Sequence, residues 1–181
     1  MNQSATASSL RTLISAEQIQ KRIREMGRQI CDDYAGKTIH VLALLENGFV
    51  FMADLVRALE MPVTCQFIKP KYREGSTPEG CLEIFFSHDA DIRGKHVLLV
   101  EGVVHSGVTA EFLVSDLKSR GAVSVKVATL LDRQSARRVQ FQPDYFGFLV
   151  DEAYVVGYGM GSPNQTQRNL PYLAVTSERP L

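Results

Sequence analysis

The chain has 181 residues, with 20 lysine and arginine side chains against 20 aspartate and glutamate side chains, and 45% of it is hydrophobic. That length and balance predict one globular domain with a buried core, and they exclude disordered and fibrous proteins. A formal net charge of zero gives no basic field for nucleic acid or for an anionic membrane. We therefore expect neither as a partner.

The three cysteines, Cys31, Cys65 and Cys81, are widely spaced and form no C-x-x-C pair. This usage is typical of reduced thiols in a cytoplasmic protein, not of a disulfide framework or a zinc site. The longest apolar runs fall far short of the roughly 18 residues that span a membrane. Residues 1–12 lack the apolar segment of a signal peptide, so we expect a flexible N-terminal tail followed by a single domain over residues 13–181.

The first third of the chain predicts a helix, a strand and a second helix. Ser15 and Gln18 form a capping box, and the apolar residues that follow recur at steps of three and four, as on one face of a helix. The continuous apolar run Ile39–Leu45 is typical of a strand that is buried on both faces, and hence of a parallel sheet. A turn at residues 46–48 leads into the second helix, Phe49–Glu60.

The rest of the chain predicts further strands, one more helix and a long loop. Residues 69–80 are polar, with two prolines and two glycines, and predict a mobile loop between the arms of a hairpin. The predicted helix is Val108–Arg120, and the predicted strands are Pro62–Ile68, Leu82–Ser87, His96–Val104, Ser124–Leu131, Phe146–Val150 and Tyr154–Val156.

This alternation of strands and helices predicts an α/β fold with a central, mainly parallel sheet flanked by helices. Ligands bind such sheets at the carboxyl ends of the strands. The loops at residues 46–48, 101–109 and 132–134 all leave such ends, so we expect them to converge on one site.

The loop with the clearest chemistry is His105-Ser106-Gly107-Val108-Thr109, which joins an apolar strand to a helix. Backbone N–H groups at a helix start, together with two hydroxyls, can hold a phosphate, and Gly107 lets the backbone approach it closely. The alternative is a structural turn in which Ser106 or Thr109 caps the helix. The loop alone favours this alternative, because Ser-Gly-x-Thr is short and common.

The whole chain adds a resemblance to a known family. Six segments carry it, in the family's order: Phe49–Arg57, Gly94–Glu101, Val125–Leu131, Pro143–Gly147, Tyr154–Tyr158 and Arg168–Tyr172. From about Leu13 to Leu181 the chain resembles the hypoxanthine-guanine phosphoribosyltransferases, which are type I phosphoribosyltransferases of purine salvage. The resemblance implies that fold, with a long flexible hairpin loop and a small C-terminal hood, in a homodimer or homotetramer.

The resemblance also implies an activity. The family transfers the phosphoribosyl group of 5-phosphoribosyl 1-pyrophosphate to a purine base, with magnesium, and releases pyrophosphate. Glu101 matches the first ribose carboxylate and is a weak candidate magnesium ligand, and His105 matches the acidic residue that contacts the purine N7. The remaining matches are Ser106, Gly107, Val108 and Thr109 for the phosphate, Asn47, Gly48 and Arg168 for pyrophosphate, Arg133, Tyr154 and Val155 for the base, and Lys71 and Tyr72 in the mobile loop.

Several positions depart from the family pattern, and they all fall in one site. Gly102 replaces the acidic neighbour of Glu101, Gly161 replaces an acidic residue that faces metal and base, and Glu46 replaces a lysine in the pyrophosphate turn. A neutral imidazole at His105 can accept the N7 proton, whereas an adjacent donor phosphate favours its protonated form. These changes predict weak or altered activity.

Two other functions stay open beside the enzyme. The chain can be a catalytically silent homologue that binds a nucleotide or an anion as a regulatory module, or a structural subunit that pairs through the fold's dimer surface. Turnover that depends on magnesium separates the enzyme from the silent binder, and the absence of ligand binding indicates the structural subunit. The basic pair Arg137-Arg138 is interpreted as a solvated face near the dimer contact.

Overall fold

The computed structural model describes residues 10–72, 82–86, 91–152, 154–162, 164 and 166–176, with the backbone alone for residues 70–72 and 82–86. The helices are α1 (Ala16–Asp33), α2 (Phe49–Arg57) and α3 (Val108–Ser119), with a 3-10 turn at Gln134–Ala136. The strands are β1 (Arg11–Ile14), β2 (Ile39–Leu44), β3 (Val63–Tyr72), β4 (Leu82–Phe86), β5 (His96–Val104), β6 (Ser124–Asp132), β7 (Tyr145–Leu149), β8 (Val155–Val156) and β9 (Leu173–Val175).

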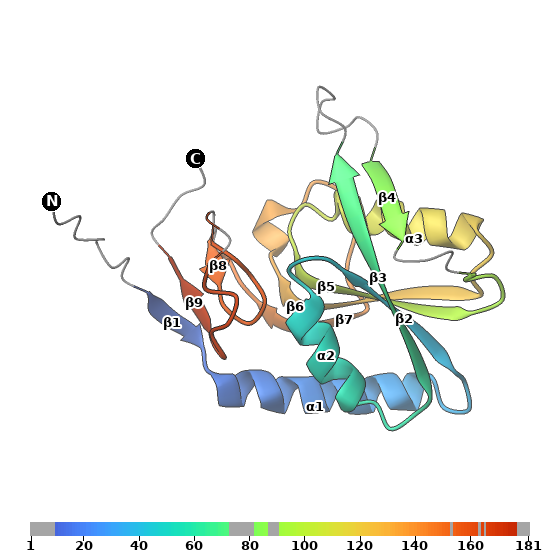
Figure 1. Ribbon diagram of the computed structural model, residues 1–181, viewed down its shortest axis with the longest axis horizontal. Coiled ribbons are helices and arrows are strands. Elements are labelled where there is room, and N and C mark those ends of the chain that lie inside the picture. The colour runs from blue at the N-terminus through green and yellow to red at the C-terminus, as the bar shows by residue number, and fades with distance from the viewer. Residues whose placement is uncertain are drawn as a thin grey trace, which may run out of the picture.

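The main sheet has the strand order β4-β3-β2-β5-β6-β7 (Figure 1). Its central strands pair in parallel, and β4 returns antiparallel to β3 as the second arm of a hairpin. The predicted mainly parallel α/β sheet is therefore confirmed. Within the part of the chain that the structure describes, no helix is both long and apolar enough to cross a membrane.

Buried residues form two apolar layers, one on each face of the sheet. Successive side chains of a strand point to opposite faces, so in β2 Val41 and Ala43 pack toward α1 and α2, while Leu42 and Leu44 pack toward α3. All six residues of β2 are buried, the five apolar ones as well as His40. The sheet is thereby held between helices, and the loops that follow its strands are left at one edge.

The predicted start of α1 is confirmed in detail. The Ser15 hydroxyl accepts a hydrogen bond from the Gln18 amide at 3.3 Å, and the Gln18 side chain accepts one from the Ser15 amide at 2.8 Å. This reciprocal cap satisfies two N–H groups that have no partner within the helix.

A second, three-stranded sheet has the order β1-β9-β8 and lies beside one end of the main sheet (Figure 1). It joins the N-terminal strand to the C-terminal segment, because Arg11 pairs with Val175 and Thr12 with Ala174. The tail predicted for residues 1–12 is therefore too long by these two residues. Their side chains have no apolar alternation, so the pairing with β9 was not visible in the local sequence.

The predicted mobile loop also begins too early at residue 69. Strand β3 continues to Tyr72, with Lys71 opposite Glu83 and Tyr72 opposite Leu82 in β4. Lys71 and Tyr72 are therefore strand residues, and their assignment to the loop is corrected. The proline at position 70 misled the prediction, because proline is rarely found in the interior of a strand. The rest of the predicted loop, residues 73–80, lies outside the described residues.

Candidate active site

A cavity of about 280 Å³ lies where the carboxyl ends of β5 and β6 meet the β8 segment. Residues far apart in the sequence line it. They include Asn47 from the turn before α2, His105 from the loop after β5, Leu131 from β6, Tyr154 and Val155 from the β8 segment, and Arg168. The expected convergence of loops at this edge of the sheet is confirmed for the turn at 46–48 and the loop after β5.

A smaller cavity of about 180 Å³ adjoins the first and shares Asn47 and Val103 with it. Glu46, Glu101, Gly102 and Thr109 are among its other lining residues. The ionisable side chains that line it in the described chain are thus both acidic. The two cavities together form one site with an imidazole and an aromatic ring on one side and two carboxyl groups on the other.

The loop between β5 and α3 places a glycine at the start of the helix. Gly107 is the N-cap of α3, in the left-handed conformation with φ +81°, and no side chain caps this end through a hydrogen bond. The hydroxyl of Ser106 accepts only a long contact of 3.4 Å from the Val108 amide. The structural alternative, in which Ser106 or Thr109 is the N-cap residue, is therefore not what the chain adopts.

Arg137 contacts the start of this loop. Its guanidinium donates to the carboxylate of Asp132 and, at 2.8 Å, to the backbone carbonyl of His105. The Asp132 side chain is 1% exposed and that of Arg137 13%. The interpretation of Arg137 as part of a solvated face is therefore wrong, because a buried aspartate at the end of β6 draws it inward. Arg138 is the exposed member of the pair.

His105 lines the larger cavity and lies near two arginines, Arg133 and Arg137. Desolvation of the imidazole, and then the charges of Arg133 and Arg137, lower the pKa of His105 below its ordinary value. Both effects disfavour the imidazolium form. The protein alone therefore acts in the opposite direction to the protonation expected beside a donor phosphate, and it holds an imidazole that can accept a proton.

Glu101 is a buried carboxyl group in the middle of the site. It is 7% exposed, and its Oε1 has no hydrogen-bond partner among the described residues. Burial, only partly offset by the charge of Arg137, raises the pKa of Glu101 to about 8. The side chain is therefore largely protonated at neutral pH, with one oxygen directed toward no protein group.

The described residues show no assembled metal site. Within the described chain no group of three or more His, Cys, Asp or Glu side chains could hold a metal ion. Magnesium is often held by one or two carboxylates together with substrate phosphates, and Glu101 is the implied carboxylate here. Because the described residues assemble no ligand set, no step of the proposed reaction is assigned to a metal.

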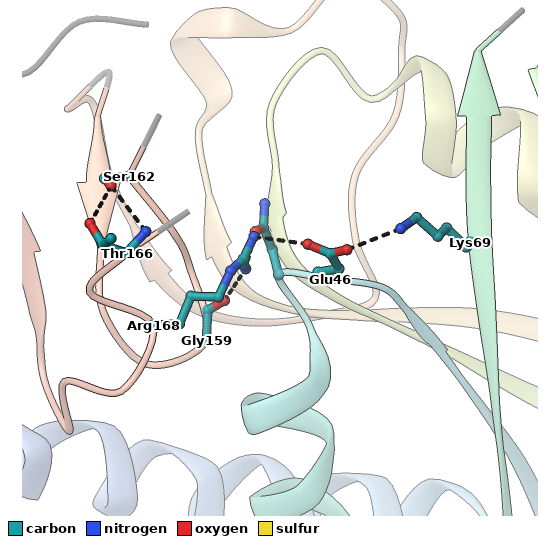
Figure 2. A network of polar contacts seen from close by, with 7 residues as sticks. Glu46, Lys69, Gly159, Ser162, Thr166 and Arg168 are labelled. Carbon is teal, nitrogen blue, oxygen red and sulfur yellow. Dashed lines mark hydrogen bonds and ion pairs between the residues drawn. The ribbon is translucent and has the colours of Figure 1, made fainter. Parts of the chain in front are cut away.

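Glu46 joins two cations at the edge of the site, as Figure 2 shows. One of its carboxylate oxygens pairs with Lys69 Nζ at 3.0 Å, and the other pairs with Arg168 Nη2 at 3.3 Å. Arg168 also donates to Asn47 Oδ1 at 2.9 Å and to the carbonyl of Gly159. The hydrogen bond from Lys69, and then the charges of Lys69 and Arg168, lower the pKa of Glu46.

The two glycines that replace acidic residues stand at close contacts. A Cβ atom at position 102 would overlap the backbone carbonyl oxygen of Asn47, and one at position 161 would lie 2.9 Å from Arg168 Nε. Restoring a carboxylate at Gly102 or Gly161 would therefore require the turn at 46–48 or the Arg168 side chain to move. Both glycines belong to the packing of this site.

The structure thus brings together most of the predicted site residues. Asn47, His105, Tyr154, Val155 and Arg168 line the larger cavity, and Glu101 and Thr109 line the smaller one. Arg133 is half-buried and is not among the lining residues in the described chain, so its contact with a base stays a prediction. The side chains of Lys71 and Tyr72 lie outside the description.

Three residues that help to form the site were not among those predicted from the sequence. Lys69, Asp132 and Arg137 act through pairings that span from 5 to 32 residues, and neither helical nor strand periodicity indicates them. The one available signal was the aspartate that ends a buried strand, since a carboxylate there needs a cation or a hydrogen-bond donor.

Comparison with known proteins identifies relatives over most of the chain. A family model described as phosphoribosyl transferase domain matches residues 12–163. The hypoxanthine-guanine phosphoribosyltransferase of Streptococcus pneumoniae (strain ATCC BAA-255 / R6) is 36% identical over 169 residues, which are 93% of each protein. A crystal structure of a hypoxanthine-guanine phosphoribosyltransferase from Bacillus anthracis, with a HEPES molecule in its active site, has a TM-score of 0.86 at 35% identity and covers 93% of this chain and 99% of that one.

Some relatives are much longer than this chain. The bifunctional protein TilS/HprT of Listeria monocytogenes serotype 4b (strain F2365) is 36% identical over 166 residues, which are 91% of this chain but 26% of that protein. This chain therefore spans about a quarter of the length of such relatives.

We predict that Arg137→Met destabilises the protein by about 3–5 kcal/mol, because it leaves the Asp132 carboxylate buried without its cation. The matched control is Arg138→Met, which removes the same charge from the exposed neighbour and should change the free energy of unfolding by at most about 0.5 kcal/mol. Urea denaturation of both variants measures the difference. Equal losses in the two variants would contradict the buried pair.

We predict that Glu101→Gln gains stability over the wild type as pH rises. Above its ordinary value of 4.5 the carboxyl group ionises in the unfolded chain, whereas the folded chain keeps the proton up to about pH 8. The raised pKa therefore costs the wild type up to about 1.4 kcal/mol per pH unit across that window and nothing further above it. Denaturation curves of both proteins from pH 5 to 9 test this, and a constant difference between them would refute it.

Proposed function

The chain belongs to the phosphoribosyl transferase family, and we propose that it transfers a phosphoribosyl group from 5-phosphoribosyl 1-pyrophosphate to a purine base such as hypoxanthine or guanine. The observation that carries the proposal is one cavity lined by both His105, which directly precedes the loop that starts α3, and Tyr154. The enzyme relatives cover nearly the whole chain, which supports the same activity.

In the proposed reaction a ring nitrogen of the purine attacks C1 of the ribose. The bond from C1 to the diphosphate oxygen breaks, and its electron pair leaves with pyrophosphate. The proton that the purine loses, or shares through N7, is accepted by the neutral imidazole of His105. Such general base assistance contributes about 10²–10⁴-fold to a rate.

The remaining groups orient the substrates. The 5-phosphate lies against the backbone N–H groups of the loop at residues 106–109, where the start of α3 favours an anion. The ring of Tyr154 stacks on the purine. The unpaired oxygen of Glu101 meets a ribose hydroxyl, which supplies the partner that this buried atom lacks in the protein.

The activity we propose is weak or altered compared with that of the family. The diphosphate end of the site has Glu46 where the resemblance implies a lysine. Gly102 and Gly161, where it implies acidic residues, leave fewer carboxylates around the ribose and the leaving group. Electrostatic stabilisation of a leaving anion is often the largest part of catalysis. These changes therefore reduce the rate more than the presence of His105 in place of the acidic residue does.

A second candidate is a catalytically silent homologue that binds a purine nucleotide. The bridge that Glu46 forms with Lys69 and Arg168 favours it, because a carboxylate already neutralises the cations nearest to the site. Nucleotide binding without turnover would support this candidate. Magnesium as cofactor, a homodimer or homotetramer, and a cytoplasmic location stay predictions.

We predict that the protein forms nucleotide from phosphoribosyl pyrophosphate and hypoxanthine, guanine or xanthine in a spectrophotometric assay, and that His105→Gln lowers kcat by about 10²–10⁴-fold. The glutamine can form hydrogen bonds but cannot accept the proton. His105→Asp, which restores an ionisable acceptor, should retain more activity than His105→Gln.

His96→Gln is the matched control, because His96 lies at the amino end of strand β5, whereas the site lies at its carboxyl end. Its kcat should equal that of the wild type. Turnover that is unchanged in His105→Gln would rule out the role of the imidazole. If neither the wild type nor His105→Asp shows turnover but both still bind nucleotide, the enzyme hypothesis is rejected in favour of the silent nucleotide-binding homologue.

A further inference from the structure

The Glu46 carboxylate is held at both of its oxygens by cations from distant parts of the chain. Lys69 comes from β3, 23 residues away, and Arg168 comes from the segment before β9, 122 residues away. Both contacts are visible in Figure 2, where Glu46 lies between the two cations. A carboxylate in this arrangement occupies the position that an anionic ligand would take between the same cations.

The bridge lies at the junction of the two cavities. Glu46 lines the smaller cavity, Arg168 lines the larger one, and Asn47, which accepts from Arg168, lines both. The other ionisable group of the smaller cavity is Glu101. A diphosphate that enters here meets an ionised carboxylate and finds the adjacent cations already paired, so it is repelled until Glu46 moves.

Arg168 does not depend on Glu46 for its position. Its guanidinium lies against Gly161, where no side chain intervenes, and it donates to Asn47 Oδ1 and to the carbonyl of Gly159. Neutralising Glu46 would therefore leave this cation in the site, still held by Asn47 and Gly159. The exposed position of Glu46, whose side chain is 50% accessible, allows that change without disturbing the core.

We propose that Glu46 is an internal competitor for the diphosphate group, so that a diphosphate-bearing ligand binds only by displacing this carboxylate from Lys69 and Arg168. The inference rests on the proposed function for the identity of the diphosphate. It assigns to Glu46 a role in substrate choice: the site accepts a nucleoside monophosphate, whose single phosphate lies at residues 106–109, more readily than a diphosphate donor.

The competition is moderate in strength. Ion pairs that are open to solvent are screened and are displaced at small cost. Removing the charge of Glu46 acts twice, because it releases two cations and abolishes the repulsion between carboxylate and diphosphate. We therefore expect the affinity for inorganic pyrophosphate to rise on the order of ten-fold in Glu46→Gln at low ionic strength.

Isothermal titration calorimetry with inorganic pyrophosphate tests this on the full chain, without any need for turnover. The matched control is Glu152→Gln, which removes one negative charge from the larger cavity at a residue that pairs with Arg11 and not with Arg168. Its affinity for pyrophosphate should stay within about two-fold of the wild type, and thermal unfolding verifies that both variants fold. Inosine 5′-monophosphate is the second probe, and its affinity should be the same in wild type and Glu46→Gln.

Pyrophosphate binding that tightens in Glu46→Gln alone supports the proposal. An unchanged or weaker affinity in that variant, or an equal gain in Glu152→Gln, overturns it. The outcome is independent of the proposed enzyme activity. A gain in pyrophosphate affinity without turnover in any variant would support the role of Glu46 and reject the enzyme activity. Normal turnover with an unchanged pyrophosphate affinity would support the enzyme activity and reject the role of Glu46.

Discussion

The guanidinium of Arg168 is the contact on which the geometry of the site depends. It links the segment before β9 to the turn between β2 and α2, through Asn47 and Glu46, while it lies flat against Gly161. The small sheet of β1, β9 and β8 and the large parallel sheet contribute separate walls of the larger cavity. Within the site, Arg168 joins these two walls. Elsewhere the two sheets are joined by their shared apolar core and by the Tyr158 hydroxyl, which donates to Asp54 in α2.

The loss of acidic residues from this site follows a common physical pattern. Gly102 and Gly161 both leave room for a neighbour that fills the space: the carbonyl of Asn47 in the first case and the guanidinium of Arg168 in the second. The negative charge that remains is placed differently. Glu101 is buried and protonated, whereas Glu46 is ionised and paired with two cations. Both of these acidic residues line the smaller cavity, the side of the site where we propose that the diphosphate binds.

Much of the fold could be predicted from the sequence, because its signals are local. The buried run of β2, the capping box at Ser15 and Gln18 and the alternation of strands with helices each reflect backbone and burial requirements of adjacent residues. The pairing of β1 with β9 could not be predicted in this way, since Arg11 and Thr12 carry no apolar pattern and their partners lie at the other end of the chain. The same holds for the site. His105, Tyr154 and Arg168 were found through the resemblance to a known family. The inward turn of Arg137 depends on the burial of Asp132, which only the packed structure creates.

We propose that the site binds a purine nucleotide through the 106–109 loop and the β8 segment, while the Glu46 carboxylate occupies the diphosphate end. A crystal structure of the protein with inosine 5′-monophosphate tests this most directly. The account predicts the phosphate at the backbone N–H groups of residues 106–109, the base between Tyr154 and His105, and Glu46 still paired with Lys69 and Arg168. A nucleotide phosphate bound by Arg168 and Lys69, with Glu46 displaced, would contradict it.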